Sequence, residues 1–194
     1  MSEPIEIVTI DGRRQRSERS RAAIITATLS LLDGGNLSPT AKQIAEEAGI
    51  GLRSFFRHFE DMDALLNEID DHLRQYYEGL FGRPIDDGSI EERILASIIL
   101  RTDAYERLKK IMLSTQAHLW RSDAAQTNYG RNLDLMRKHF EECLPELEAL
   151  PADKREAAHA AASFEVWHRL RYHQKLNLSE AREAVLSMLR GLLG

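Results

Sequence analysis

Cysteine and long apolar runs are scarce in this chain of 194 residues. Cys143 is the only cysteine, which excludes an intrachain disulfide and a cysteine zinc cluster. No apolar run approaches the roughly 18 residues of a membrane span. The N-terminus holds no apolar stretch long enough for a signal peptide. We therefore expect a cytoplasmic protein.

The sequence also lacks the signatures of catalysis. It contains no phosphate-cradling glycine loop, no Gly-x-Ser-x-Gly and no His-Glu-x-x-His. The acidic pairs Asp70-Asp71 and Asp86-Asp87 fall on a charged helix and in a loop, where solvation explains them. The sequence therefore predicts no enzyme and no cofactor.

A metal site has weak support. His139 and Cys143 are four residues apart, so they share a helix face, and both residue types bind metals. His168 and His173 are not spaced for one face. Two ligands do not make a site, which favours a buried, inert cysteine beside a surface histidine. A metal-responsive protein remains an alternative.

Charge is distributed unevenly along the chain. The net charge is −5, yet the first 60 residues carry as many basic as acidic side chains. Within them, Glu18 is the only acid in a short segment with five arginines: Arg13, Arg14, Arg16, Arg19 and Arg21. A basic arm on an acidic body is typical of a DNA-binding regulator.

Apolar residues recur at three- and four-residue spacing, which predicts an all-α fold of about nine helices. Residues 1–15 show no such period and are expected to be a disordered arm. Ser17 and Ser179 are expected to cap the first and last helices, Asp61 the fourth, and Ser89 the next one, with Glu92 as its capping-box partner. The expected helices are about 17–33, 40–48, 51–58, 61–80, 89–120 (as one helix or two), 124–144, 152–174 and 179–193.

The two short helices meet the demands of a helix-turn-helix. Thr40 can cap the first of them, and Ala45 is small where the second helix crosses. Gly49 suits the positive φ of the turn. The apolar positions point to one small core: Ile44, Ala48, Ile50 and Phe55.

In such a motif the second helix enters the DNA major groove with its N-terminal residues at the base edges. Arg53 is the strongest candidate for base reading, because its fork matches O6 and N7 of guanine. Gly51 allows the backbone to approach closely, and Arg57 and His58 lie one turn on, toward phosphates. The predicted DNA-binding residues are Thr40, Lys42, Gly51, Leu52, Arg53, Ser54, Phe56, Arg57 and His58.

Residues about 16–66 resemble the N-terminal domain of the TetR family of regulators. The resemblance rests on paired apolar residues in the first helix, a glycine and a threonine after it, an Ile-Ala…Ala-Gly core and an aromatic second helix. These are Ile24-Ile25, Leu31-Leu32, Gly35, Thr40, Ile44-Ala45, Ala48-Gly49-Ile50 and Phe56-Arg57-His58-Phe59.

The resemblance implies a homodimeric repressor on a palindromic operator, released by a small molecule that binds in the helical body. It divides the chain into an arm (1–15), a helix-turn-helix domain (16–60) and a ligand-sensing and dimerisation domain (61–194), which dimerises through about 152–193. The fourth helix, 61–80, is the expected lever between sensing and DNA. Candidate pocket residues are Tyr105, Met112, His118, Trp120, Tyr129 and Met136, although residues of these types at helical spacing are usually part of the core.

Three positions depart from the family pattern. Phe56 stands where the family has a tyrosine, Met62 where it often has a lysine, and Gly51 where a serine often caps the helix. Fewer phosphate contacts imply weaker, less salt-sensitive binding, for which we expect the arginines at 13–21 to compensate. The alternative is an all-α dimeric interaction protein with a degenerate helix-turn-helix. Arg53 at the centre of the presumed reading surface argues against it.

Overall fold

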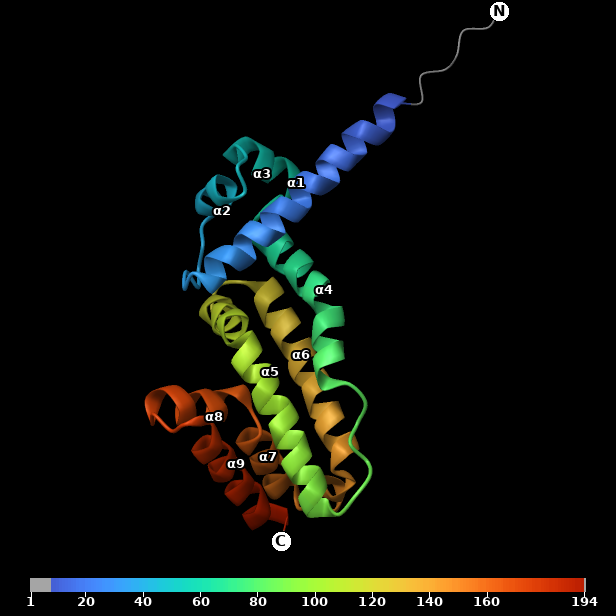
Figure 1. Ribbon diagram of the computed structural model, residues 1–194, viewed down its shortest axis with the longest axis vertical. Helices are drawn as coiled ribbons and strands as arrows, with labels where there is room; N and C mark the ends of the chain where they lie inside the picture. Colours follow the sequence, from blue (N-terminus) through green and yellow to red (C-terminus); the bar gives the residue numbers. More distant parts are fainter. Residues whose placement is uncertain (1–7, 194) are drawn as a thin grey trace, which may run out of the picture. The chain divides into compact units, whose positions relative to one another are not determined.

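The computed structural model describes residues 8–193, and its regular structure is helical throughout that range (Figure 1). This confirms the all-α prediction, with nine α-helices and two shorter helical turns among the described residues. The elements of the N-terminal half are α1 (Val8–Asp33), α2 (Ala41–Glu47), α3 (Leu52–His58), α4 (Met62–Phe81) and α5 (Ile90–His118). Those that follow are α6 (Asp123–Cys143), the 3-10 turn η1 (Pro145–Ala149), α7 (Ala152–Ala161), α8 (Phe164–His168), the π turn η2 (Arg169–His173) and α9 (Leu178–Leu193).

Local capping explains where several helices begin. Asp61 Oδ1 accepts the N–H of Ala64 at 2.7 Å and starts α4, as predicted. Ser89 and Glu92 form the expected capping box at α5: the Ser89 N–H donates to Glu92 Oε2 (2.8 Å) and the Glu92 N–H to Ser89 Oγ (3.3 Å). From this cap α5 continues unbroken to His118, so the stretch from 89 to 120 holds one helix rather than two.

The first helix begins earlier than predicted. It starts at Val8, so Ser17 is an exposed residue inside it rather than its cap, and residues 8–15 are helical instead of disordered. The described side chains before position 20 are exposed, which is why this stretch shows no apolar period. A helical ion pair between Arg14 and Glu18 (3.0 Å) lies on it. Residues 1–7 of the expected arm lie outside the described range.

The predicted helix 152–174 is wrong as a single element. The helix ends after Ala161, and Ser163 adopts an extended backbone whose hydroxyl accepts the Val166 N–H at 3.3 Å and begins α8. The last helix is capped by Asn177 rather than by Ser179. Asn177 Oδ1 accepts the Glu180 N–H (3.0 Å) while Glu180 returns a carboxylate oxygen to the Asn177 N–H (2.8 Å). At Ser163 a side chain that competes for backbone hydrogen bonds thus interrupts an otherwise continuous apolar pattern.

The chain divides into two compact units, each with its own core. The first runs to His72 and takes in Lys110–Asn128, so it holds α1 to α3, the start of α4, the end of α5 and the start of α6. The second holds Leu73–Lys109 and the residues from Tyr129 onward. The first core is built on Ile24, Ile25, Leu32, Ile44, Phe55, Phe59, Leu65 and Ile69, and the second on Ile98, Tyr105, Phe140, Leu144, Leu147, Phe164, Trp167, Val185, Leu186 and Leu189.

None of the described helices is both long enough and apolar enough to cross a lipid bilayer.

Candidate nucleic-acid interface

Helices α2 and α3 are held against the second half of α1 by a small shared core (Figure 1). Ile44 and Phe55 are completely buried, and Ala45, where α2 is crossed, is almost so. Phe59, directly after α3, is equally buried and packs on Phe55 with ring centroids 5.9 Å apart. Helices of seven residues are marginal alone, so this core is what holds them in place.

The turn between α2 and α3 has the expected geometry. Gly49 has φ = +67°, a conformation that residues with a Cβ resist, which confirms its predicted place in the turn. Thr40 caps α2 in a capping box with Gln43, since Thr40 Oγ1 accepts the Gln43 N–H at 3.3 Å and Gln43 Oε1 accepts the Thr40 N–H at 2.9 Å. The reversal therefore places α3 across α2 with little freedom.

Helix α3 presents a mixed apolar and basic face to solvent. Arg53 and Arg57 are exposed, and Leu52 and Phe56, one turn apart, are 42% and 50% exposed. Phe56 meets the buried Phe55 edge-on, with centroids 5.2 Å apart, so its ring is held in place while its outer side is open. Gly51, before the helix, is exposed and has nothing within 4 Å of the place a Cβ would take, and Ser54 is half-buried.

The remaining predicted DNA-binding residues flank this face. Lys42 is exposed and weakly paired with Glu46 at 3.9 Å. Thr40 is exposed, but its hydroxyl is engaged with Gln43. His58 is half-buried, and burial, followed by the charges of Arg57 and Arg21, lowers its pKa below the usual value. The neutral form of His58 is therefore favoured.

Arg21 has a structural role that the sequence did not suggest. Its guanidinium makes two hydrogen bonds to the Glu68 carboxylate (2.9 and 2.8 Å), donates to the His58 carbonyl (3.1 Å) and lies 4.6 Å from the Phe59 ring centre. One side chain on α1 thus fixes the end of α3 and the body of α4. The signal was available, because Arg21 precedes Ile25 by four residues and so shares the core face of α1.

The turn between α5 and α6 contacts both ends of the helix-turn-helix segment. His118 Nε2 lies 3.2 Å from Ser38 Oγ, which also accepts a hydrogen bond from Arg121 (2.8 Å), and Ser38 lies two residues before the α2 cap. Ser122 donates to Asp63 Oδ1 in the first turn of α4 at 2.7 Å. These residues belong to the first unit and were not among the predicted functional residues, apart from His118.

The six candidate pocket residues are divided between the two compact units. Met112, His118 and Trp120 belong to the first unit, and Tyr105, Tyr129 and Met136 to the second. Trp120 is 76% exposed, and His118 is buried against Ser38 as described. Tyr105 is buried and donates its hydroxyl proton to the Ala162 carbonyl at 2.7 Å. A pocket that all six share remains a prediction.

Cys143 is buried, as the sequence predicted, and close to His139, with Sγ and Nδ1 3.7 Å apart. The Ile85 N–H donates to the sulfur at 3.3 Å, and His139 Nε2 lies 3.1 Å from the Phe81 carbonyl. Burial raises the pKa of the thiol, but His139 and the Ile85 amide outweigh it and lower the pKa overall. Among the side chains that the structure describes, no third residue of metal-binding type joins this pair.

A tightly cored three-helix unit with an outward-facing, arginine-bearing third helix has the architecture of the helix-turn-helix domains that bind DNA.

Comparison with known proteins gives the family. Residues 24–69 match the family model of bacterial regulatory proteins of the TetR family. The fold resembles the crystal structure of a protein from Rhodococcus sp. assigned to the TetR family of transcriptional regulators, with a TM-score of 0.62 and 17% identity. That likeness covers 91% of this chain and 100% of the other, and it shows a common fold. The match is confined to the N-terminal part of the chain, which is therefore similar to the DNA-binding domain of TetR-family regulatory proteins.

Proposed function

We propose that the protein is a homodimeric, cytoplasmic repressor that binds a palindromic operator through α3 and leaves it when a small molecule binds the helical body. The outward face of α3 carries this proposal. Arg53 is exposed at the start of a helix whose other side is locked into a completely buried core. A cation in that position has no structural task, whereas it suits the bidentate acceptors of guanine.

Exposed apolar side chains on the same face fit base contacts as well. Leu52 and Phe56 flank Arg53 and can reach a thymine methyl group, the apolar feature of the major groove. We propose that Arg53, Leu52 and Phe56 read bases. Thr40, Lys42, Gly51, Ser54 and Arg57 approach the backbone, and His58 does so as a neutral partner.

The experiment that tests this proposal is a selection of binding sites from random duplex DNA at fixed salt. We expect the protein to enrich a palindrome and Arg53→Ala to lose or relax that preference, by about 1–3 kcal/mol at the guanine concerned. Arg83→Ala, an exposed arginine in the loop between α4 and α5, is the matched control and should select the same sequence. Equal enrichment by the protein and Arg53→Ala would refute the role of Arg53.

One observation favours a second function. Leu52 and Phe56 expose large apolar surfaces that would also suit a protein partner, and Phe56 and Met62 lack the phosphate-binding groups common in the family. An interaction protein with a degenerate helix-turn-helix would enrich no DNA sequence, while remaining folded and dimeric. Any residual DNA binding would then show no preference and would vanish as salt screens it.

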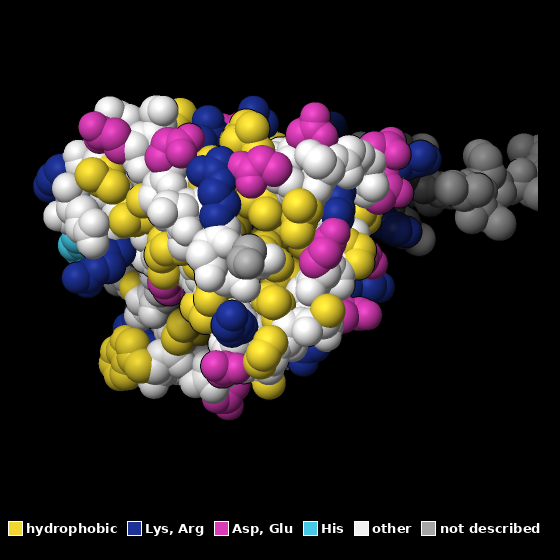
Figure 2. Space-filling model, turned by 90° about the horizontal axis from the view of Figure 1, so that it is seen from below, with side chains coloured by type: hydrophobic (Ala, Val, Ile, Leu, Met, Phe, Trp, Pro, Cys, Tyr) yellow, Lys and Arg dark blue, Asp and Glu magenta, His cyan; other side chains and the backbone are white. Residues whose placement is uncertain are grey.

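Dimerisation is supported by the surface of the last helices. Helices α7 and α9 pack on each other. Small side chains are exposed on α7, at Ala157 and Ala160, and Met188 on α9 is 37% exposed beside the half-buried Ala184. Figure 2 shows that hydrophobic side chains reach the surface among charged ones on one end of the molecule. Small residues allow close approach of partner helices, as a four-helix bundle between two subunits requires.

Release from DNA requires a mechanical link to the helix-turn-helix. We propose that α4 and the turn between α5 and α6 provide it, because Ser38 and Asp63, at either end of the DNA-binding segment, hydrogen-bond that turn. A ligand that favours a different position of the turn would lower the operator affinity by its preference for that state and no more.

A further inference from the structure

Arg101, on α5 in the second unit, is a buried cation with no counter-ion among the side chains that the structure describes. It is 4% exposed and forms no ion pair with any of those side chains. One terminal nitrogen donates to the Met136 carbonyl, the other lies 3.5 Å from the Tyr105 hydroxyl, and Nε has no acceptor. The ring of Phe140, 4.6 Å from the guanidinium carbon, gives a cation–π contact. Much of the hydrogen-bonding capacity of this fork is therefore unused.

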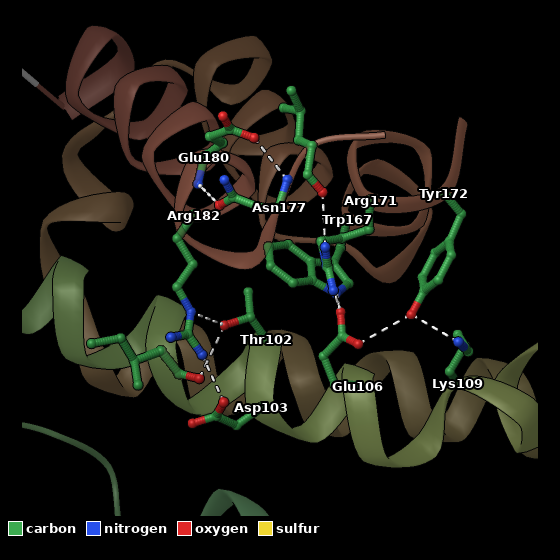
Figure 3. A network of polar contacts seen from close by, with 12 residues as sticks. Thr102, Asp103, Glu106, Lys109, Trp167, Arg171, Tyr172, Asn177, Glu180 and Arg182 are labelled. Carbon is green, nitrogen blue, oxygen red and sulfur yellow. Dashed lines mark hydrogen bonds and ion pairs between the residues drawn. The ribbon is translucent and has the colours of Figure 1, made fainter. Parts of the chain in front are cut away.

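Neighbouring arginines in the second unit are each paired with an acidic side chain. Figure 3 shows two of them reaching α5: Arg171 binds Glu106 at 2.8 Å and Arg182 binds Asp103 at 2.6 Å. Glu106 also accepts hydrogen bonds from Trp167 and Tyr172, and together with Arg171 these hold its pKa below the usual value despite burial. A buried charge without such a partner is costly, and it persists where a ligand can provide the counter-ion.

Arg101 also borders a gap between α5, the break that joins α7 to α8, and α9. In this conformation the gap is too narrow to admit a water molecule. Its polar lining consists of Arg101 and the hydroxyl-bearing Thr102, Tyr105 and Ser163. The rest is apolar: Ile98, Ala161, Ala162, Trp167 and Val185. A cation and hydroxyl groups among apolar walls suit a ligand with an anionic head and an apolar body.

We propose that Arg101 is the anchor of the ligand site in the sensing body, and that the ligand is an organic carboxylate with an alkyl or aromatic body. The inference rests on the proposed function in taking this half of the chain as the sensor. The planar guanidinium fork matches the two oxygens of a carboxylate. A single cation among apolar walls would neutralise one negative charge, which favours a carboxylate over a doubly charged phosphate.

The ligand must open the gap to enter. The gap is bordered by the Ala162-Ser163 break, where the helical hydrogen bonds of α7 stop and those of α8 begin. The Tyr105 hydroxyl, now donating to the Ala162 carbonyl, closes this point. Burial raises the Tyr105 pKa, so the hydroxyl stays protonated and can turn its donor to a carboxylate oxygen held by Arg101.

The test measures binding of simple acids to the full chain by calorimetry and by the rise in Tm. The probes are hexanoate, octanoate and benzoate, each beside its uncharged amide. We expect at least one acid to bind about tenfold or more tightly than its amide, and Arg101→Met to lose that difference. Arg107→Met, an exposed arginine on the same helix, is the control and should bind as the unaltered protein does. The proposal is overturned if every acid behaves as its amide, or if Arg101→Met binds the acid unchanged.

A second variant protects the test against misfolding. Arg101→Lys keeps the charge but lacks the fork, so binding should weaken about tenfold, whereas unchanged binding would again overturn the proposal. Operator affinity is measured in parallel by fluorescence anisotropy, with and without the tightest acid. Acid binding that leaves operator affinity unchanged would support the site and refute ligand-driven release. Failure to find any operator would refute the regulator and leave the acid-binding result to stand by itself.

Discussion

Arg21 is the residue on which the DNA-binding unit depends most visibly. Its two hydrogen bonds to Glu68 join α1 to α4, and its bond to the His58 carbonyl completes the C-terminal end of α3. A bidentate arginine–carboxylate pair is among the stronger polar contacts, although this one is partly exposed on both sides. The orientation of the recognition helix therefore depends on a side chain outside the helix-turn-helix segment itself.

We predict that Glu68→Gln lowers the free energy of unfolding by about 1 kcal/mol at neutral pH, a value already reduced for the partial exposure of the pair. Glu18→Gln, which breaks the largely exposed pair with Arg14, is the matched control and should change stability by less than about 0.5 kcal/mol. Denaturant unfolding measures both. Equal effects of the two substitutions would show that the Arg21–Glu68 pair is no more than a surface contact.

The same pair predicts a pH dependence. Its hydrogen bond to Arg21, the largest influence, holds the Glu68 pKa below the ordinary value of 4.5. A carboxyl group with a lowered pKa in the folded state stabilises the protein fully above its unfolded pKa, and that contribution disappears as the pH falls through the folded pKa. The stability difference between the protein and Glu68→Gln should thus be constant from neutral pH to about pH 5 and shrink below 4.5. A difference that persists unchanged to about pH 3 would contradict this origin.

At the scale of elements, α1 is longer than the part of it that packs on α2 and α3. Its first turns, from Val8, lie before the residues that pack on α2 and α3, and Arg14, Arg16 and Arg19 are exposed along them. Since Arg21 is engaged with Glu68, the phosphate contacts expected of the basic segment fall to the arginines before it. A rigid helix presents these cations at fixed positions, at a lower entropic cost than a disordered arm.

Removal of residues 1–16 should weaken binding to the operator and to unrelated DNA by the same factor, because phosphate contacts carry no sequence information. The slope of log affinity against log salt should become shallower by about 0.9 for each phosphate that the shortened chain no longer neutralises. Arg53→Ala is the complementary control, since it should reduce operator preference more than it reduces non-specific binding. An unchanged affinity of the shortened chain for both DNAs would refute the role of the segment.

Most elements could be predicted from apolar periodicity, and the exceptions have physical causes. The helix-turn-helix was predictable because each of its features depends on one local residue: Gly49 in the turn, Thr40 at the cap and Phe55 in the core. The start of α1 was missed because a solvated helix shows no period. The break at Ser163 was missed because one side-chain hydrogen bond outweighs the continuing apolar pattern.

The site was predictable only where it is local in sequence. Arg53 and Phe56 are exposed on α3, where a short, continuous segment suffices to place them. The role of Arg101 could not be predicted from the sequence. It depends on the absence of an acid among the described side chains of α4 and α6 that surround Arg101, and the sequence does not show which side chains meet there. Likewise, the contact between Ser38 and Arg121 joins residues 83 positions apart.

For the whole molecule, coupling between the two compact units depends more on the continuity of the helices than on any single contact. Helices α4, α5 and α6 each supply residues to both compact units, so a change that begins in the second unit has covalent routes into the first. The turn between α5 and α6 then hydrogen-bonds Ser38, which lies before the helix-turn-helix, and Asp63, which lies after it. A regulator needs this coupling only if the two recognition helices of a dimer must keep a fixed spacing, about 34–36 Å for successive major grooves.

In the proposed repressor, operator binding depends on dimerisation through α7 and α9. Met188→Arg places a charge among the exposed small residues of these helices, where burial without a partner costs several kcal/mol. We expect the variant to sediment as a monomer and to lose at least about a hundredfold in operator affinity while its helix content is unchanged, because each half-site then binds alone. Leu133→Arg, a comparably exposed apolar residue on α6, should remain dimeric and bind as before. A dimeric Met188→Arg would move the subunit interface elsewhere, and a monomer with full operator affinity would show that the two recognition helices act independently.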